Sequence, residues 1–261
     1  MALAVVVVLL AAAAPSLVRT YWSMRSSNTV RRGVTRARQL NCFSCHGELG
    51  RGGLPDPTAT SGEVPSWSGG SWMMYVDNDV QISQYILDGV SQTRRESESA
   101  RAERERATIH MPAYREFLSG SDLDDLLGAF KVLSRMALPR AETPERRGLE
   151  LAERWGCFGC HGPAGSGGAP NPGSFSGFIP GWYGADFRDL VSDRGEFDSW
   201  VREGSIPRLT GHRVASYFIR RQRVTMPAYA GLSDAELDDL WAYVQWLART
   251  DGGHLGVEQP W

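Results

Sequence analysis

Lysine is almost absent from this chain. Of its 28 basic residues, 27 are arginine and one, Lys131, is lysine. A docking surface made of lysines is therefore excluded, and arginine, acidic or apolar side chains must make any contact with a partner. The formal net charge is −2, so the large positive excess that indicates nucleic-acid binding is missing as well.

Cysteine is also scarce, and its four copies fall in two short motifs, which leaves none for a disulfide framework. The motifs read Cys42-Phe43-Ser44-Cys45-His46 and Cys157-Phe158-Gly159-Cys160-His161. Both have the form C-x-x-C-H, which is typical of haem c attachment: two thiols at this spacing reach the vinyl groups on one haem edge, and the histidine reaches the iron. A zinc site would need more Cys or His nearby, and a thioredoxin-like dithiol a βαβ pattern; neither is present. We therefore predict two covalently bound haem c groups, with His46 and His161 as proximal ligands.

An internal repeat connects the two motifs, because residues recur at a constant offset of 115 (157 − 42). The recurring positions include Gly47, Gly50, Gly52, Gly53, Pro55, Pro57, Pro65, Trp67 and Gly89. They end with Met111-Pro112-Ala113-Tyr114, which returns as Met226-Pro227-Ala228-Tyr229. The spacing from histidine to methionine is 65 residues in both copies (111 − 46 and 226 − 161).

In this arrangement the chain resembles the class I cytochrome c family, over roughly residues 30–136 and 144–250. The resemblance rests on a C-x-x-C-H motif, a later Met-Pro and a final amphipathic helix, which occur in this order twice. It implies an all-α fold with two tandem cytochrome c domains. It also implies that Met111 and Met226 are the sixth iron ligands of the two haems.

Other residues compete with Met111 for the role of ligand. His110 precedes it, but its counterpart in the second copy is a threonine, which favours a polar loop residue. Met73 and Met74 have charged counterparts, which favours packing residues over ligands.

One tryptophan recurs in the stretch rich in glycine and proline after each motif, at 47–71 and 162–184, where we expect irregular loops around the cofactor. Two interpretations of Trp67 and Trp182 stay open: an indole N–H that binds a haem propionate, or a ring that anchors the loop in the core. Both are candidate cofactor-binding residues.

The N-terminus is apolar from residue 2 to residue 18, and Tyr21 and Trp22 follow as interfacial aromatics do. As a helix this run spans roughly 26 Å, against a bilayer core of about 30 Å. We interpret residues 1–28 as a transmembrane anchor and linker rather than a cleaved signal peptide, because the positively charged start of a signal peptide is missing. The arginines that follow the run oppose the expected orientation, since positive charge usually stays inside.

The remaining length suits two domains of about 110 residues. We predict a first cytochrome c domain at 29–140 and a second, with a C-terminal tail, at 141–261. Helices should open them at 29–41 and after the cap of Thr143 and Pro144.

Two further features recur in these helices. Gly33 and Gly148 stand in the opening helices, and in the family a small residue there lets the first and last helices cross closely. The last helices should begin at Ser121 and at a capping box of Ser233 and Glu236.

The two copies differ most just before the methionine. Residues 94–106 hold five Arg and four Glu without a large apolar residue, which predicts a solvated helix or loop with local charge pairs. Residues 209–223 have apolar residues at helical spacing, which predicts a half-buried helix. Arginines crowd there, for which a solvated face is the simplest explanation and haem propionates or an acidic partner are alternatives: Arg208, Arg213, Arg220, Arg221 and Arg223.

A haem with His and Met ligands has no open iron position, and methionine raises its reduction potential, which favours electron transfer. We expect a dihaem cytochrome c in the cytoplasmic membrane, with its haem domains on the periplasmic side where the family attaches haem c. It would pass electrons between an integral-membrane respiratory or photosynthetic complex and a soluble or membrane-bound redox protein, as a subunit of such a complex. The alternatives are a dihaem peroxidase, which the equal His-to-Met spacing opposes, and the dihaem subunit of a terminal oxidase.

Overall fold

The computed structural model describes residues 28–253, and these form helices and loops without a strand. Two isolated bridges pair Pro55 with Glu63 and Pro170 with Phe178. The predicted all-α class is confirmed for this part of the chain. None of the described helices is long and apolar enough to cross a bilayer. The predicted anchor, residues 1–28, lies outside the described residues except for Asn28.

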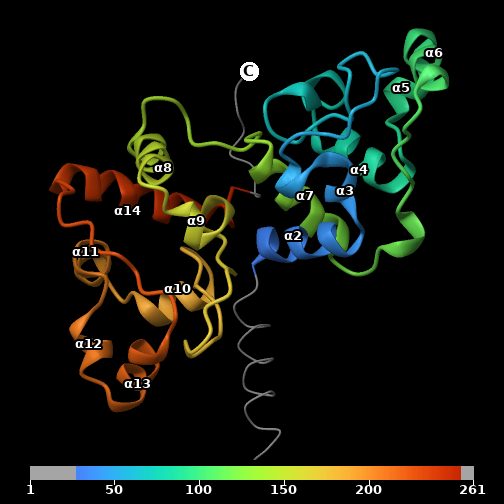
Figure 1. Ribbon diagram of the computed structural model, residues 1–261. Coiled ribbons are helices and arrows are strands. Elements are labelled where there is room, and N and C mark those ends of the chain that lie inside the picture. Colours follow the sequence, from blue (N-terminus) through green and yellow to red (C-terminus); the bar gives the residue numbers. More distant parts are fainter. Residues whose placement is uncertain (1–27, 254–261) are drawn as a thin grey trace, which may run out of the picture. The chain divides into compact units, whose positions relative to one another are not determined.

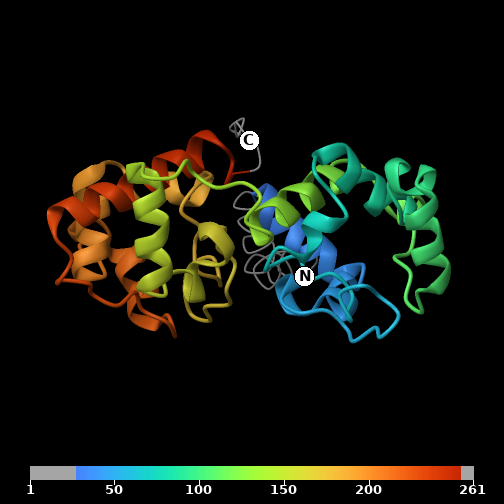
Figure 2. The same ribbon diagram turned by 90° about the horizontal axis from the view of Figure 1, so that it is seen from above.

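The described chain divides into an N-terminal unit, Thr29–Leu138, and a C-terminal unit, Pro139–Asp251. The helices of the N-terminal unit are α2 (Thr29–Gln39), α3 (Cys42–His46), η1 (Glu48–Gly50), η2 (Ser71–Met74), α4 (Asp79–Asp88), α5 (Gln92–Glu96), α6 (Glu98–Arg106), η3 (Arg115–Phe117) and α7 (Asp122–Leu133) (Figures 1 and 2). Those of the C-terminal unit are α8 (Pro144–Arg154), α9 (Phe158–His161), η4 (Pro163–Gly165), α10 (Ala185–Leu190), α11 (Arg194–Glu203), α12 (Pro207–Thr210), α13 (Arg213–Arg221) and α14 (Asp234–Arg249).

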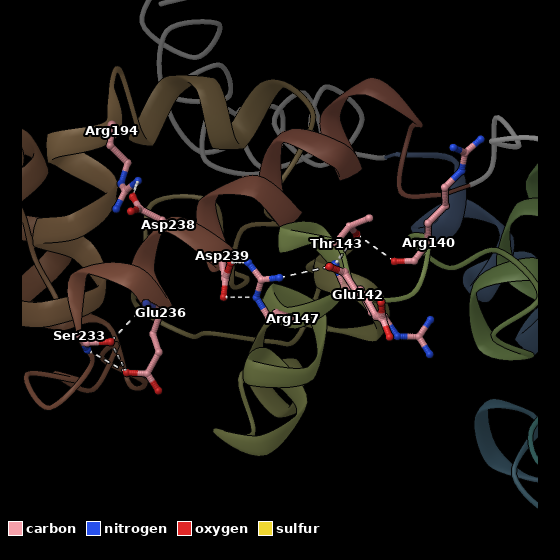
Figure 3. A network of polar contacts seen from close by, with 10 residues as sticks. Arg140, Glu142, Thr143, Arg147, Arg194, Ser233, Glu236, Asp238 and Asp239 are labelled. Carbon is pink, nitrogen blue, oxygen red and sulfur yellow. Dashed lines mark hydrogen bonds and ion pairs between the residues drawn. The ribbon is translucent and has the colours of Figure 1, made fainter.

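Local sequence signals set the bounds of several helices. The Thr143 side chain caps α8 by accepting a hydrogen bond from the Arg146 amide, with proline as the next residue. Ser233 and Glu236 form the predicted capping box at the start of α14 (Figure 3). Ser121 precedes α7 as expected, although its side chain makes no capping bond.

The first and last helices of each unit cross through a glycine. A Cβ atom on Gly33 in α2 would lie 1.8 Å from the Asp125 carbonyl oxygen in α7. A Cβ on Gly148 in α8 would lie 2.0 Å from the Asp239 carbonyl oxygen in α14. The predicted close crossing is confirmed, and it admits no side chain at either glycine.

An ion pair reinforces each crossing next to its glycine. Arg32 donates to both carboxylate oxygens of Asp125, at 2.8 and 2.6 Å. Arg147 donates in the same way to Asp239, at 2.8 and 2.7 Å (Figure 3). Such two-bonded pairs fix the rotation of one helix against the other as well as their separation.

Each unit has its own apolar core beneath the motif. The N-terminal core contains Phe43, Trp67 and Trp72 with Leu126 and Phe130 of α7. The C-terminal core contains buried side chains of α8, α11 and α14, among them Leu151, Ala152, Phe197, Leu237, Leu240 and Val244. The two motifs are thereby placed against the last helix of their own unit.

Candidate functional site

The first C-x-x-C-H motif lines a pocket in the N-terminal unit. Cys42, Cys45 and His46 contribute to it from α3, and Trp67 and Met111 contribute from the loops that follow. The structure therefore gathers all the predicted cofactor residues of the first copy around one pocket. Aliphatic and aromatic side chains of α4 and α7, among them Ile82, Ile86 and Phe130, form part of the remaining wall, as a flat apolar ligand requires.

The orientation of the His46 ring follows from one hydrogen bond. Its Nδ1 lies 2.7 Å from the Pro65 carbonyl oxygen. Because a carbonyl only accepts, Nδ1 carries the proton and Nε2 keeps its lone pair. Burial lowers the pKa of His46 below its usual value, so the ring is neutral at pH 7. A neutral imidazole held through Nδ1–H is the form that binds metals.

The C-terminal unit repeats this arrangement. Nδ1 of His161 lies 3.0 Å from the Pro180 carbonyl oxygen, and burial lowers the pKa of His161 as well. Met226 is half-buried and packs against the same core cluster as Cys157 and Trp182. These three predicted residues of the second copy therefore lie against one core cluster, and His161 lies beside Trp182.

The first thiol of each motif is poorly suited to redox exchange. Burial raises the pKa of Cys42 and of Cys157 to about 11. Both thiols are protonated at neutral pH, whereas a redox-active dithiol needs a lowered pKa. The first thiol of each motif therefore lacks the lowered pKa of a redox-active dithiol.

Trp67 and Trp182 lie beside the proximal histidines. Their ring centroids are 5.6 Å from that of His46 and 5.3 Å from that of His161, respectively. Trp67 also meets the edges of Phe43 and Phe130. These contacts are those of a loop anchored in the core, and a bond to a haem propionate stays a prediction.

Trp72 is a pocket residue that the sequence reasoning missed. It is buried and lines the pocket, and its indole nitrogen has no hydrogen-bond partner among the described residues. A buried N–H without an acceptor is costly, and a bound group with carboxylates would provide one. Trp72 escaped notice because it does not recur at the offset of 115. With the thiols, the neutral imidazole and the methionine, this pocket fits a haem c.

The rival ligands occupy different surroundings. His110 is exposed, yet it lines the first pocket beside Met111. Met73 and Met74 are 58% and 51% exposed, so the prediction that they pack is wrong. They follow Trp72 in η2, and its ring takes the interior position of that turn.

The predicted half-buried helix at 209–223 is also corrected. It forms as α13, but it has no buried residue, and Val214 and Tyr217 are 56% and 49% exposed. Phe175 covers part of its apolar side by packing against Phe218, with ring centroids 5.1 Å apart. Periodicity identified an amphipathic helix, but nothing in the unit covers it fully.

Comparison with known proteins assigns one part of the chain. Residues 146–248 match the family Cytochrome c, a span that includes the second motif, Met226 and the α8–α14 crossing. No curated protein and no solved structure matches the chain. The match covers less than half of the chain. Residues 146–248 are thus similar to the cytochrome c domains of electron-transferring haem proteins.

Proposed function

We propose that this chain is a dihaem cytochrome c that transfers electrons. Cys42 and Cys45 would hold one haem c and Cys157 and Cys160 a second. The axial ligands would be His46 with Met111 and His161 with Met226. The family match supports the second site, and the pocket supports the first.

One observation carries the proposal: each C-x-x-C-H motif presents a half-buried, neutral histidine whose Nδ1–H is bound to the carbonyl of a repeated proline, Pro65 or Pro180. That bond fixes the imidazole ring and leaves Nε2 free for a metal. When bound, a haem with His and Met on its two faces exchanges one electron and has no open position for peroxide. The apolar walls of the pocket keep water from its faces.

We also propose that residues 1–28 anchor the protein in the cytoplasmic membrane, with the haem domains on the periplasmic side. The apolar run and the aromatic pair after it support this. The electron partners would be an integral-membrane respiratory or photosynthetic complex, of which this chain is a subunit, and a second redox protein.

The partner of the C-terminal unit would be acidic. Between Gly204 and Ser233 the sequence has five arginines and no acidic residue. The exposed arginines of this stretch form what we call the arginine face, next to the Met226 loop: Arg213, Arg220, Arg221 and Arg223. Exposed aromatic and aliphatic side chains lie among them on α13, as is common at protein interfaces.

Haem stoichiometry tests the proposal. Pyridine haemochrome absorbance should give two haems per chain that resist acid–acetone extraction. The pairs C42A/C45A and C157A/C160A should each retain one. A single haem in the unmodified chain would refute the assignment of the first pocket.

The methionine-to-iron absorption of the oxidised protein in the near infrared tests the ligands. Met111→Ala and Met226→Ala should each remove about half of it, by the loss of one of two equivalent bonds. An unchanged spectrum in Met111→Ala, with a changed one in His110→Ala, would make the first haem a bis-histidine site.

A further inference from the structure

The loops that carry the two methionines are tied down at both ends. We call residues 108–114 and 223–229 the methionine loops. At their C-terminal ends, the Tyr114 amide donates to the Ile86 carbonyl at 3.1 Å, and the Tyr229 amide donates to the Val201 carbonyl at 2.9 Å. These bonds fasten each loop to an earlier helix of its own unit, α4 or α11.

The glycine that ends each of these helices lies directly against the backbone of the methionine. Gly89 and Gly204 have φ values of 72° and 71°, and a Cβ on either would lie 2.3 Å from the carbonyl oxygen of Met111 or Met226. The backbone of each methionine therefore rests on a glycine. This explains why the glycine recurs in both copies.

The N-terminal end of the second methionine loop is tied by a buried amide side chain. Oδ1 of Asn171 accepts from the Val224 amide at 2.9 Å, and its Nδ2 donates to the Val224 carbonyl at 2.9 Å. One side chain thus binds the backbone of Val224 on both sides, as a neighbouring strand would. The Arg223 amide donates to the Pro172 carbonyl at 2.9 Å, so two successive amides of the loop are held.

The first copy holds the same two amides with different groups. Asp56, at the repeat position of Asn171, accepts from the Ile109 amide at 3.3 Å. Thr58 accepts from the Thr108 amide at 2.7 Å and donates its own hydroxyl proton to Asp56. Asp56 is 2% exposed and Asn171 4%. The hydroxyl of Thr58 holds the pKa of the Asp56 carboxyl below its usual value, so the carboxylate is ionised and only accepts.

We propose that Asp56 and Asn171 are positioning residues that hold Met111 and Met226 at their irons, and so set the strength of each iron–methionine bond. This rests on the proposed function. The backbone amide that each of these side chains binds lies two residues before the methionine, and the hydrogen-bonded tyrosine amide lies three residues after it. A loop held at both ends keeps the thioether close when the bond to the metal breaks, because few other conformations are available to it.

The two positions tolerate different replacements. Asn in place of Asp56 keeps an acceptor for the Ile109 amide, but its NH2 group then faces the Thr58 amide, which donates to the other carboxylate oxygen at 3.0 Å, so Asn satisfies only part of the site. Asp in place of Asn171 loses the donor to the Val224 carbonyl and sets a carboxylate against it. Gly173 occupies the position of Thr58 there, so no hydroxyl is available to satisfy the charge.

Imidazole, which competes with methionine for haem iron, is the probe for the second loop. In the full chain with Met111→Ala, the near-infrared methionine absorption reports only Met226. Adding Asn171→Ala should lower the imidazole concentration that removes half of this absorption by about tenfold, for a loss of two buried hydrogen bonds. Asn171→Asp should lower this imidazole concentration as much as Asn171→Ala does. Ser176→Ala is the control. It removes a hydrogen bond to the Phe178 carbonyl in the same glycine- and proline-rich loop as Asn171, and it should leave the imidazole midpoint unchanged.

The first loop gives the mirror experiment in a Met226→Ala chain. Asp56→Ala should weaken methionine against imidazole about tenfold, and Asp56→Asn, which keeps the acceptor for Ile109, should restore part of the difference. Ser61→Ala is the matched control, because Ser61 bonds to Glu63 as Ser176 does to Phe178.

Two results would overturn the proposal. One is an imidazole midpoint in Asn171→Ala or Asp56→Ala equal to that of its serine control. The other is a shift fully accounted for by lower stability of the whole unit in urea, which indicates a structural role alone. Absence of methionine absorption in the starting chains, by contrast, would refute the proposed function before any tie is altered.

Discussion

The segments that lead to the two methionines differ in what they show to solvent. In the N-terminal unit, α5 and α6 hold one partly buried ion pair among exposed charges of both signs: Arg94 binds Glu103 and lies 4.8 Å from the centroid of the Tyr75 ring. Thr60 donates to the same glutamate. In the C-terminal unit, α13 exposes its arginines over a stretch without acidic residues. The backbone ties at the methionine are alike in both units, so the fold holds that geometry while the outer surface diverges.

Because of this difference, the two segments suit different contacts with a charged partner. The five arginines and four glutamates of residues 94–106 nearly balance in charge, so this segment attracts a charged partner only weakly. An exposed arginine face attracts anions from a distance and loses little solvation on contact. This difference supports the proposal that exchange with an acidic partner takes place at the C-terminal unit.

The largest expected effect comes from adding a methyl group to the glycine at either helix crossing. Gly148→Ala puts a methyl group 2.0 Å from a backbone carbonyl, and it should cost the C-terminal unit about 4 kcal/mol in free energy of unfolding. Gly33→Ala should do the same to the N-terminal unit. Gly159→Ala is the control, since a Cβ there meets nothing within 4 Å. Urea unfolding followed by circular dichroism measures the three; equal midpoints for Gly148→Ala and Gly159→Ala would contradict the crossing.

Charge reversal on the arginine face should come next. Arg220→Glu with Arg223→Glu should slow oxidation by ferricyanide, a small anion, about tenfold at low ionic strength. Arg101→Glu with Arg106→Glu changes the net charge equally but on α6, and it should have a smaller effect. Stopped-flow rates at low and high salt check this, because screening should erase the difference. Equal slowing by both pairs would leave only a net-charge effect.

A smaller effect is expected from breaking the ion pair of Arg94 and Glu103, two residues that line the N-terminal pocket. Arg94→Gln leaves Glu103 partly buried without its cation, and it should cost about 1 to 2 kcal/mol of stability in that unit. Adding Glu103→Gln should recover part of this loss. Arg213→Gln on the exposed α13 should cost less than about 0.5 kcal/mol. Thermal unfolding of the four proteins checks the order, and an Arg213→Gln loss as large as that of Arg94→Gln would contradict it.

The smallest effect concerns acid. Arg208 lowers the pKa of Glu196 to about 2 from its usual 4.5. The stability that this lowered pKa provides is present above pH 4.5 and is lost as pH falls toward 2. Because Arg208 is half exposed, the loss should be below about 1 kcal/mol.

The N-terminal unit supplies the control for this acid effect. It has Gln81 at the repeat position, which accepts from the Asp77 amide as Glu196 does from the Ser192 amide. Glu196→Gln should therefore keep the turn and flatten the acid dependence in urea titrations between pH 5 and pH 2. If Glu196→Gln left the slope of stability against pH unchanged, the acid dependence would belong to other carboxylates.

Much of the fold was predictable because its signals are local or repeated. The C-x-x-C-H motifs, the caps at Thr143 and Ser233, and the glycines at 33 and 148 need no knowledge of distant residues. The offset of 115 then identified Met111 and Met226, which the first pocket and the second core place beside their motifs.

The rest depends on contacts between residues far apart in the sequence. Asn171 acts on a backbone 53 residues away, and its repeat partner is an aspartate, so a search for identical residues passes over both. Comparing polar side chains of similar shape at the same offset would have found them. The exposure of α13 was missed for another reason: periodicity shows which side of a helix is apolar, not whether the fold supplies a cover.

The helix crossings also bear on the order of biosynthesis. The ion pairs beside them join residues 93 and 92 positions apart in sequence, so a chain emerging from its N-terminus makes these contacts late. The attachment cysteines precede the closing helix by most of that length. We therefore expect each pair of thiols to be accessible to haem-attaching enzymes in a nascent chain whose unit has not yet closed, with the last helix sealing the cofactor afterwards.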